Sequence, residues 1–225
     1  MALSNEDGYL PSNVTARRCR AVVITGCSGA GKSTLLAELG RRGHRVFTEA
    51  GRQIVREQDW IGGTTLPWTA PEAFCELLLS RAMHQLISAA AEPGLAFFDR
   101  SVVEPLSGLA RMGLPVPDHF TRAAALCRYD ETVFVAPPWP EIHHTDPERR
   151  HGFEEALADY EPLRATYRRL GYRLVELPRV DVAARADFVL AELGKPGTCT
   201  SACPRPDPTR SSPGRRGRRR ACRRP

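Results

Sequence analysis

The stretch AVVITGCSGAGKSTLLAEL, residues 21–39, decides the fold that we expect for this chain. It opens with a run of apolar and β-branched residues, which predicts a buried strand over residues 21–25. Three glycines then fall within six positions, and a leucine-rich helical pattern begins around Lys32. A strand, a glycine-rich turn and a helix in direct succession indicate a backbone that curves closely around a bound anion.

The glycine-rich turn carries the phosphate-binding pattern G-x-x-x-x-G-K-[ST], the P-loop. Glycines let successive amides point at phosphate oxygens, because no Cβ blocks the approach. Lys32 adds a positive charge for the β- and γ-phosphates, the Ser33 hydroxyl is placed to coordinate Mg²⁺, and we expect Thr34 to contact the α-phosphate. The residues predicted to bind the nucleotide are Gly26, Cys27, Ser28, Gly29, Ala30, Gly31, Lys32, Ser33 and Thr34.

Four further apolar runs alternate with helical patterns along the chain. They predict strands at residues 45–48, 95–99, 131–135 and 173–177. Because this order is typical of βαβ units, we expect an α/β protein with the three-layer P-loop NTPase fold: a mainly parallel five-stranded sheet flanked by helices, with a lid segment. Thr69 and Glu72 predict a capping box at a helix start, and Gly171 predicts the end of another helix.

Composition predicts one domain with two polar extensions. We expect a flexible leader over residues 1–19, a nucleotide-binding domain over 20–194, and a disordered arginine- and proline-rich tail over 195–225. The formal net charge of +6 comes from this tail, where residues 196–225 hold nine arginines against one aspartate, so the domain itself is near neutral. Apolar runs of membrane-spanning length are absent from the sequence, which predicts a cytoplasmic protein.

An acidic residue follows the third predicted strand in LAFFDRS, residues 95–101. Asp99 is a candidate either to hold Mg²⁺ together with Ser33 or to accept a proton from an attacking hydroxyl, and a turn cap is the structural alternative. Motor ATPases usually carry a glutamate directly after this aspartate to polarise water, whereas here Arg100 follows. The pair favours a phosphotransferase in which Arg100 binds the acceptor, and Glu104 is a further candidate for that role.

Two other segments supply candidate site residues. Glu49 and Arg52 follow the second predicted strand three residues apart, so on a helix they share a face and are candidates to bind a second substrate; a solvated ion pair is the alternative. Residues 136–152 are rich in proline and histidine and predict a lid. Its Arg149 and Arg150 are candidates to stabilise the transferring phosphoryl group, or else form an exposed pair at a helix start.

With the P-loop, FFDRS at residues 97–101 and TDPERRHG at 145–152 in place, the chain resembles a known family over about residues 20–193. This AAA-type ATPase family groups the ribosylnicotinamide-kinase domain of the bacterial NAD regulator with a GTP- and phosphoinositide-binding animal protein. The resemblance implies phosphate binding at residues 26–34, a metal or base role for Asp99, and lid contacts from Arg149 and Arg150. It implies no particular acceptor, because members bind different second ligands.

Together these patterns predict a P-loop enzyme that uses ATP and Mg²⁺ to phosphorylate an unidentified small-molecule acceptor, with Lys32, Asp99, Arg149 and Arg150 as catalytic residues. The alternative is a switch that slowly hydrolyses ATP or GTP and regulates a partner or binds lipid. P-loop contacts are to the phosphates and the guanine-selecting N-K-x-D pattern is absent, so the sequence leaves the base open between ATP and GTP, and ATP is our working expectation. The arginine-rich tail is a candidate for weak contact with nucleic acid or an acidic surface, or else a solvated extension.

Overall fold

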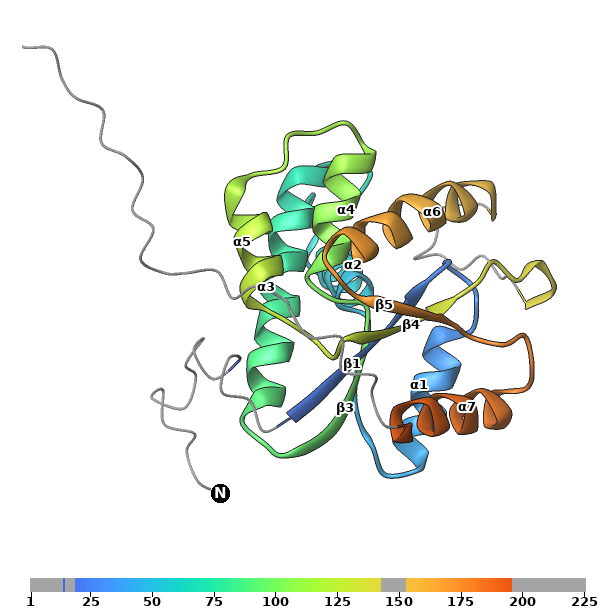
Figure 1. Cartoon of the computed structure of the whole chain (residues 1–225). Coiled ribbons are helices and arrows are strands. Elements are labelled where there is room, and N and C mark those ends of the chain that lie inside the picture. Colours follow the sequence, from blue (N-terminus) through green and yellow to red (C-terminus); the bar gives the residue numbers. More distant parts are fainter. Residues whose placement is uncertain (1–13, 15–18, 143–152, 196–225) are drawn as a thin grey trace, which may run out of the picture.

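The computed structural model of this chain describes Val14, residues 19–142 and residues 153–195 (Figure 1). Most of the predicted leader, the tail beyond Lys195, and the later part of the predicted lid, with Arg149 and Arg150, lie outside the described residues.

A parallel sheet of five strands forms the centre of the described structure, with the strand order β2-β3-β1-β4-β5 (Figure 1). The predicted strands are confirmed to within two residues at each end, and all pairings in the sheet are parallel. The strands are β1 (Cys19–Gly26), β2 (Arg45–Phe47), β3 (Gly94–Asp99), β4 (Thr132–Ala136) and β5 (Arg173–Glu176).

Helices cover both faces of this sheet. In the described residues they are α1 (Lys32–Arg41), α2 (Ala50–Ile61), α3 (Pro71–Ala90), α4 (Val103–Arg111), α5 (Asp118–Leu126), α6 (Phe153–Arg169) and α7 (Val182–Gly194), with a short 3₁₀ segment, η3 (Pro140–Ile142). Helices α1 and α7 pack together on one face, while α3, α4 and α6 cover the other (Figure 1). Within the part of the chain that is described, no helix is both long and apolar enough to cross a membrane.

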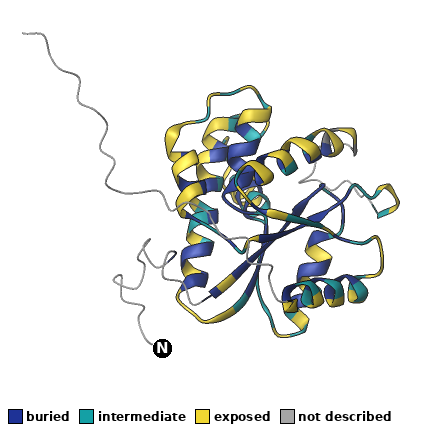
Figure 2. Ribbon diagram, in the orientation of Figure 1, coloured by how far each residue is buried: buried dark blue, intermediate teal, exposed yellow. Residues whose placement is uncertain are grey.

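Strand β1 lies in the middle of the core. Its Val22, Val23 and Ile24 have no exposed surface, as expected for a parallel strand covered on both faces. The dark blue of buried residues runs along most of the central strands (Figure 2). Helix α1 packs Leu35 and Leu39 into the same core, and burial of each such side chain contributes about 1.5–3 kcal/mol. The strand and helix that carry the P-loop are therefore held firmly from both sides.

Two helix predictions differ from the structure. The predicted capping box at Thr69 and Glu72 is wrong, because α3 has Ala70 as its N-cap and no side-chain cap. Pro71 occupies the first turn and keeps the preceding residue out of the helical region, so the helix starts one residue later than the capping box requires. The prediction also omits α7, which Asp181 caps by accepting a hydrogen bond from the Ala184 amide at 2.9 Å.

The sheet topology places the candidate residues at one edge. Strands β1 and β3 are neighbours, and the helices that follow them, α1 and α4, lie on opposite faces of the sheet. In open parallel sheets, ligands bind in the crevice that such a divergence leaves at the carboxyl ends of the strands. Ile24 pairs with Asp99 and Gly26 with Ala136, so the P-loop and Asp99 emerge side by side at this edge.

We predict that Gly26→Ala is strongly destabilising. Gly26 has a φ of 111°, and an added Cβ would stand 2.3 Å from the Ala136 carbonyl oxygen, a backbone atom that cannot rotate away. Left-handed strain and the backbone clash add, so the free energy of unfolding should fall by more than about 3 kcal/mol in urea denaturation.

Gly43→Ala is the matched control for this substitution. Gly43 also has a positive φ, 90°, but nothing lies within 4 Å of an added Cβ. Only the conformational strain remains, and we expect a loss of about 1–2 kcal/mol. Equal losses in the two variants would show that the close approach of β1 to β4 is not a constraint.

Candidate functional site

The predicted phosphate loop, residues 26–34, connects β1 to α1. Its three glycines have φ angles of 111°, 78° and 74°, conformations that glycine adopts without strain. Gly31 is the N-cap of α1 and offers no side-chain cap. The first amides of a helix have no partner within the helix, and they lie at the positive end of its dipole. The end of α1 therefore presents a ready anion-binding site.

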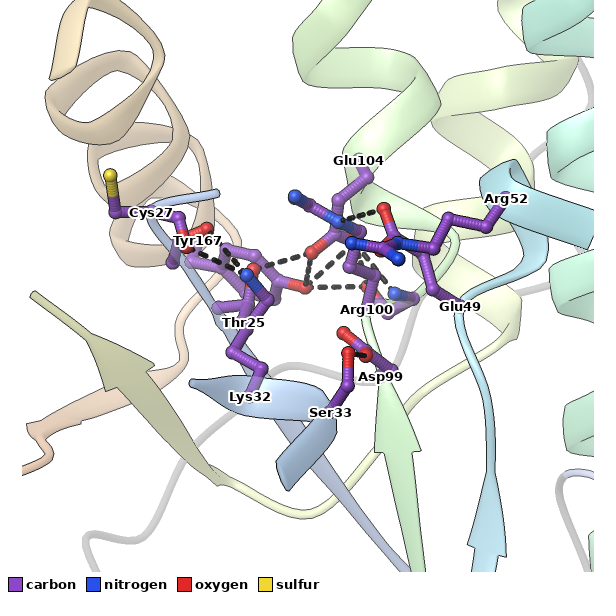
Figure 3. A network of polar contacts seen from close by, with 12 residues as sticks. Thr25, Cys27, Lys32, Ser33, Glu49, Arg52, Asp99, Arg100, Glu104 and Tyr167 are labelled. Carbon is purple, nitrogen blue, oxygen red and sulfur yellow. Dashed lines mark hydrogen bonds and ion pairs between the residues drawn. The ribbon is translucent and has the colours of Figure 1, made fainter. Parts of the chain in front are cut away.

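Lys32 lies folded across this loop. It is 4% exposed, and its Nζ donates hydrogen bonds to the carbonyl oxygens of Cys27 at 2.7 Å and Gly26 at 3.3 Å (Figure 3). These contacts hold the ammonium group over the loop backbone. The predicted phosphate-binding charge is thus in place beside the amides.

Asp99 and Ser33 meet at the predicted metal position. Asp99 is the last residue of β3 and is 3% exposed, and its Oδ2 accepts a hydrogen bond from Ser33 Oγ at 3.4 Å (Figure 3). Its Oδ1 is buried and has no hydrogen-bond partner among the described residues. A buried carboxylate oxygen without a partner is costly, and it matches the hard oxygen ligands that Mg²⁺ takes. The residues present therefore fit the predicted metal.

The surroundings of Asp99 oppose its ionisation while no cation is bound. Burial raises the pKa of Asp99 to about 6, the negative charge of Glu49 adds to the shift, and Lys32 opposes it. A bound divalent cation reverses this preference, because it favours the ionised carboxylate.

Glu49 forms an ion-paired group with two arginines. It is the N-cap of α2, and its carboxylate accepts hydrogen bonds from Arg100 Nε at 2.9 Å and from Arg52 Nε at 3.2 Å (Figure 3). Burial opposes ionisation of Glu49, but the charges of Arg100, Lys32 and Arg52 outweigh it and hold the pKa at about 2. Glu49 therefore stays ionised near neutral pH, with both oxygens oriented.

Arg100 reaches Glu49 through an unusual backbone conformation. Its φ is 73°, the only positive value at a non-glycine position in the described part of the chain, and its amide donates to the Ile24 carbonyl at 3.1 Å. Strained backbone of this kind persists where the surrounding structure fixes it, often at functional sites.

Two cavities flank the start of α1. One, of about 340 Å³, lies beside α2 and includes Ser33, Thr48, Glu49, Arg52, Gln53, Arg56 and Asp99 in its lining. The other, of about 380 Å³, is lined by P-loop residues together with Trp139, Ile142, Val180, Asp181, Val182 and Arg185. Ser33 lines both, so a phosphate chain along the P-loop would join the two cavities.

Glu104 is not brought into the cavity beside α2. Its carboxylate accepts hydrogen bonds from Thr25 Oγ1 at 2.5 Å and from the Ser101 amide at 2.7 Å, and it lies 3.0 Å from the Tyr167 hydroxyl (Figure 3). Glu104 is only 8% exposed. It joins β1, the start of α4 and α6 into one buried network, and its predicted contact with the acceptor stays a prediction.

Sequence reasoning missed several residues of the site. Thr25 was not considered because it lies in an otherwise apolar predicted strand. A hydroxyl in a buried run nevertheless indicates a buried hydrogen-bond partner. Arg185 is spaced four residues from Val189 and eight from Leu193, and all three are buried. A charge on an apolar stripe with helical spacing is the pattern that could have identified it.

Residues 21–185 match the protein family described as AAA domain, which confirms the resemblance seen in the sequence. No curated protein matches the chain in sequence.

Solved structures share the fold. A deoxyadenosine kinase from M. mycoides with the products dCMP and a flexible dCDP bound has a TM-score of 0.57 and 18% identity, covering 77% of this chain and 98% of that one. The same kinase with bound dATP gives a TM-score of 0.55 at 16% identity, with the same coverage. The NadR protein in complex with NR gives 0.57 at 18% identity, covering 80% of this chain and 53% of that one. The α/β fold is thus P-loop kinase-like.

We predict that Tyr167→Phe weakens the Glu104 network. The Tyr167 hydroxyl is buried, 3.0 Å from Glu104 and 2.6 Å from Ser101 Oγ, so its removal leaves buried polar atoms with fewer partners. The free energy of unfolding should fall by about 1–3 kcal/mol in urea. Tyr160→Phe on the same helix is the control: its hydroxyl donates at 3.2 Å to Glu176, an exposed residue, and we expect less than about 1 kcal/mol. Equal losses would contradict a special role for the network.

Asp99→Asn should change stability in a pH-dependent way when magnesium and nucleotide are absent. Because the folded pKa of Asp99 is raised from 3.8 to about 6, the folded state binds more protons than the unfolded state within that window. The wild type therefore loses stability relative to the variant as pH rises from about 4 to 7. Urea denaturation at both pH values measures this difference. A difference independent of pH would contradict the raised pKa.

Proposed function

Because this chain belongs to the AAA domain family, we propose that it is a phosphotransferase that transfers the γ-phosphoryl group of ATP to a hydroxyl of a small-molecule acceptor. The observation that carries the proposal is the cavity beside α2, where Glu49, Arg52 and Asp99 converge next to Ser33 of the P-loop. Water as the attacking group has no need of a polar cavity of about 340 Å³ at this position. A kinase among the structural neighbours supports the same class of reaction.

Nucleotide binding uses the loop between β1 and α1. The amides around Gly29 and Gly31 and the first turn of α1 bind the β- and γ-phosphates, and Lys32 exchanges its contacts with the Gly26 and Cys27 carbonyls for phosphate oxygens. Ser33 and Asp99 would hold Mg²⁺, which, when bound, neutralises charge on the phosphates. The nucleotide is ATP in this proposal, in line with our working expectation.

In this proposal Asp99 binds the metal, and Glu49 contacts the acceptor hydroxyl. Glu49 faces the same cavity, stays ionised, and is oriented by Arg100 and Arg52. Its carboxylate accepts a hydrogen bond from the attacking hydroxyl and so aligns the hydroxyl oxygen with the γ-phosphate. As this oxygen bonds to the γ-phosphorus, the bond to the β–γ bridging oxygen breaks, ADP leaves, and the hydroxyl proton passes through the carboxylate to solvent. The arginines Arg149 and Arg150 lie outside the described residues, and their predicted contact with the transferring group remains a prediction.

The polar lining limits the acceptor by chemistry. Both signs of charge and the Thr48 and Gln53 side chains border the cavity, so it suits a hydrophilic molecule with several hydrogen-bonding groups. Its volume, about 340 Å³, is that of a small-molecule site.

The test is phosphoryl transfer from γ-labelled ATP, with Mg²⁺, to a panel of nucleosides, sugars and amino alcohols. We expect labelled acceptor to form faster than free phosphate for at least one class. Glu49→Gln should lower kcat about 100-fold or more, with the affinity for ATP within about threefold of wild type. Phosphate release that no acceptor accelerates would overturn the proposal.

Glu57→Gln is the matched control on the same helix. Glu57 pairs with Arg81 at the surface, at 2.8 Å, and does not line the cavity. Its kcat should therefore equal that of the wild type. Equal activity of both variants and wild type would remove Glu49 from the mechanism.

A further inference from the structure

The second cavity, on the other side of the start of α1, contains a buried arginine that the proposed transfer does not use. Arg185 lies on α7, is 3% exposed, and lines this cavity of about 380 Å³. Arg185 shares the buried face of α7 with Val189 and Leu193, and α7 packs against α1. An apolar side chain is the usual residue at such a position.

Few groups satisfy this arginine. Its Nη1 donates to the Ala30 carbonyl of the P-loop at 3.1 Å, and its guanidinium lies 5.5 Å from the centre of the Trp139 ring. Its Nε and Nη2 are buried without a hydrogen-bond partner, and no ion pair joins it to a carboxylate, in the part of the chain that the structure describes. Desolvation lowers the pKa of Arg185.

A buried charge without a counter-charge destabilises the folded state, and so does each unpaired donor. The P-loop nevertheless leaves space for the Arg185 side chain. Gly31 has no Cβ, and an added one would stand 2.8 Å from Arg185 Nη1, so the glycine makes room for the guanidinium against the loop. The arginine is therefore seated against the backbone that is expected to bind phosphate.

The unpartnered atoms define the ligand chemistry. Nε and Nη2 form one edge of the planar guanidinium, the edge that binds two adjacent acceptor atoms at once. Both nitrogens are covered in the structure, so the Arg185 side chain, which lines the cavity, must turn for this edge to reach a ligand. In the same cavity, Trp139, Ile142, Val180 and Val182 provide apolar walls suited to a flat ring. Asp181 also lines the cavity, and its Oδ1 is used in capping α7. Thr34, the residue expected to contact the α-phosphate, also lines this cavity.

We propose that Arg185 is a nucleotide-binding residue, whose Nε and Nη2 edge holds two adjacent acceptor atoms in the nucleoside monophosphate part of the nucleotide, with the ring of the base against Trp139. Such a pair of acceptors exists both in the α-phosphate and at O6 and N7 of guanine. Adenine lacks the pair, because it presents an amino donor beside N7. This inference rests on nucleotide binding by the P-loop, and it is independent of the acceptor.

Arg185→Met tests the assignment by separating affinity from stability. Calorimetric titration with non-hydrolysable ATP and GTP analogues, with Mg²⁺, should show a Kd raised about 10- to 100-fold for at least one of them. The unliganded variant should melt at the same temperature as the wild type or higher, because the unpaired buried charge is gone. Arg185→Lys keeps the charge without the two-atom edge and should still weaken binding about tenfold.

Arg42→Met is the matched control at the same helix interface. Arg42, the C-cap of α1, pairs with Glu38 on the same helix and with Asp187 on α7, but it does not line the cavity. Its affinity for both nucleotides should stay within about threefold of wild type, whereas its melting temperature should fall or stay the same.

The outcomes are distinct. Equal weakening of ATP and GTP in Arg185→Met assigns the edge to the α-phosphate. Loss of a wild-type preference for GTP assigns it to guanine, and GTP then replaces ATP as the phosphoryl donor in the proposed function. Unchanged affinity for both nucleotides, in Arg185→Met or, should that variant not fold, in Arg185→Lys, overturns the inference. A wild type that binds no triphosphate overturns both this inference and the proposed function, while one that binds nucleotide but phosphorylates no acceptor overturns only the latter.

Discussion

The close approach of β1 to β4 at Gly26 is the constraint on which the rest of the site depends. The Ala136 carbonyl accepts a hydrogen bond from the Cys27 amide at 2.9 Å, and it leaves no room for a Cβ at the preceding residue. The chain must then turn back through further glycines before α1 begins. Because β1 is the central strand and is buried from Ala21 to Gly26, this turn is anchored in the core and its position is fixed. Rigid anchoring keeps the loop amides aligned when a phosphate arrives.

The two sides of the P-loop differ in the charge of their buried polar groups. Among the described residues, a buried Asp99 oxygen has no hydrogen-bond partner on the side of α2, and two nitrogens of Arg185 have none on the side of α7. The Asp99 oxygen is suited to bind a cation, and the two Arg185 nitrogens are suited to bind a pair of acceptor atoms. A magnesium nucleotide offers both. Both places cost the unliganded protein stability, and in the proposed complex one ligand would relieve both costs together.

Local patterns account for the parts of the structure that were predictable. The periodicity of apolar residues and the P-loop spacing predicted β1 and α1, because these elements depend on neighbouring residues. Parallel topology then predicted that Asp99 and Ser33 meet at one edge of the sheet. The role of Glu104 was not predictable: its partners Thr25 and Tyr167 are 79 and 63 residues away, and only packing brings them together. Arg185 was missed because a lone arginine among apolar residues is ordinarily exposed at the surface.

The central claim is that the amides between Gly26 and Ser33 bind a polyphosphate. It is tested most directly by the amide resonances of Gly29, Gly31 and Lys32 when a non-hydrolysable Mg-triphosphate is added. The account predicts downfield shifts at these amides, caused by new hydrogen bonds to phosphate oxygens, with the Gly43 and Gly113 amides unchanged. Saturating nucleotide that leaves the loop amides unmoved would contradict it.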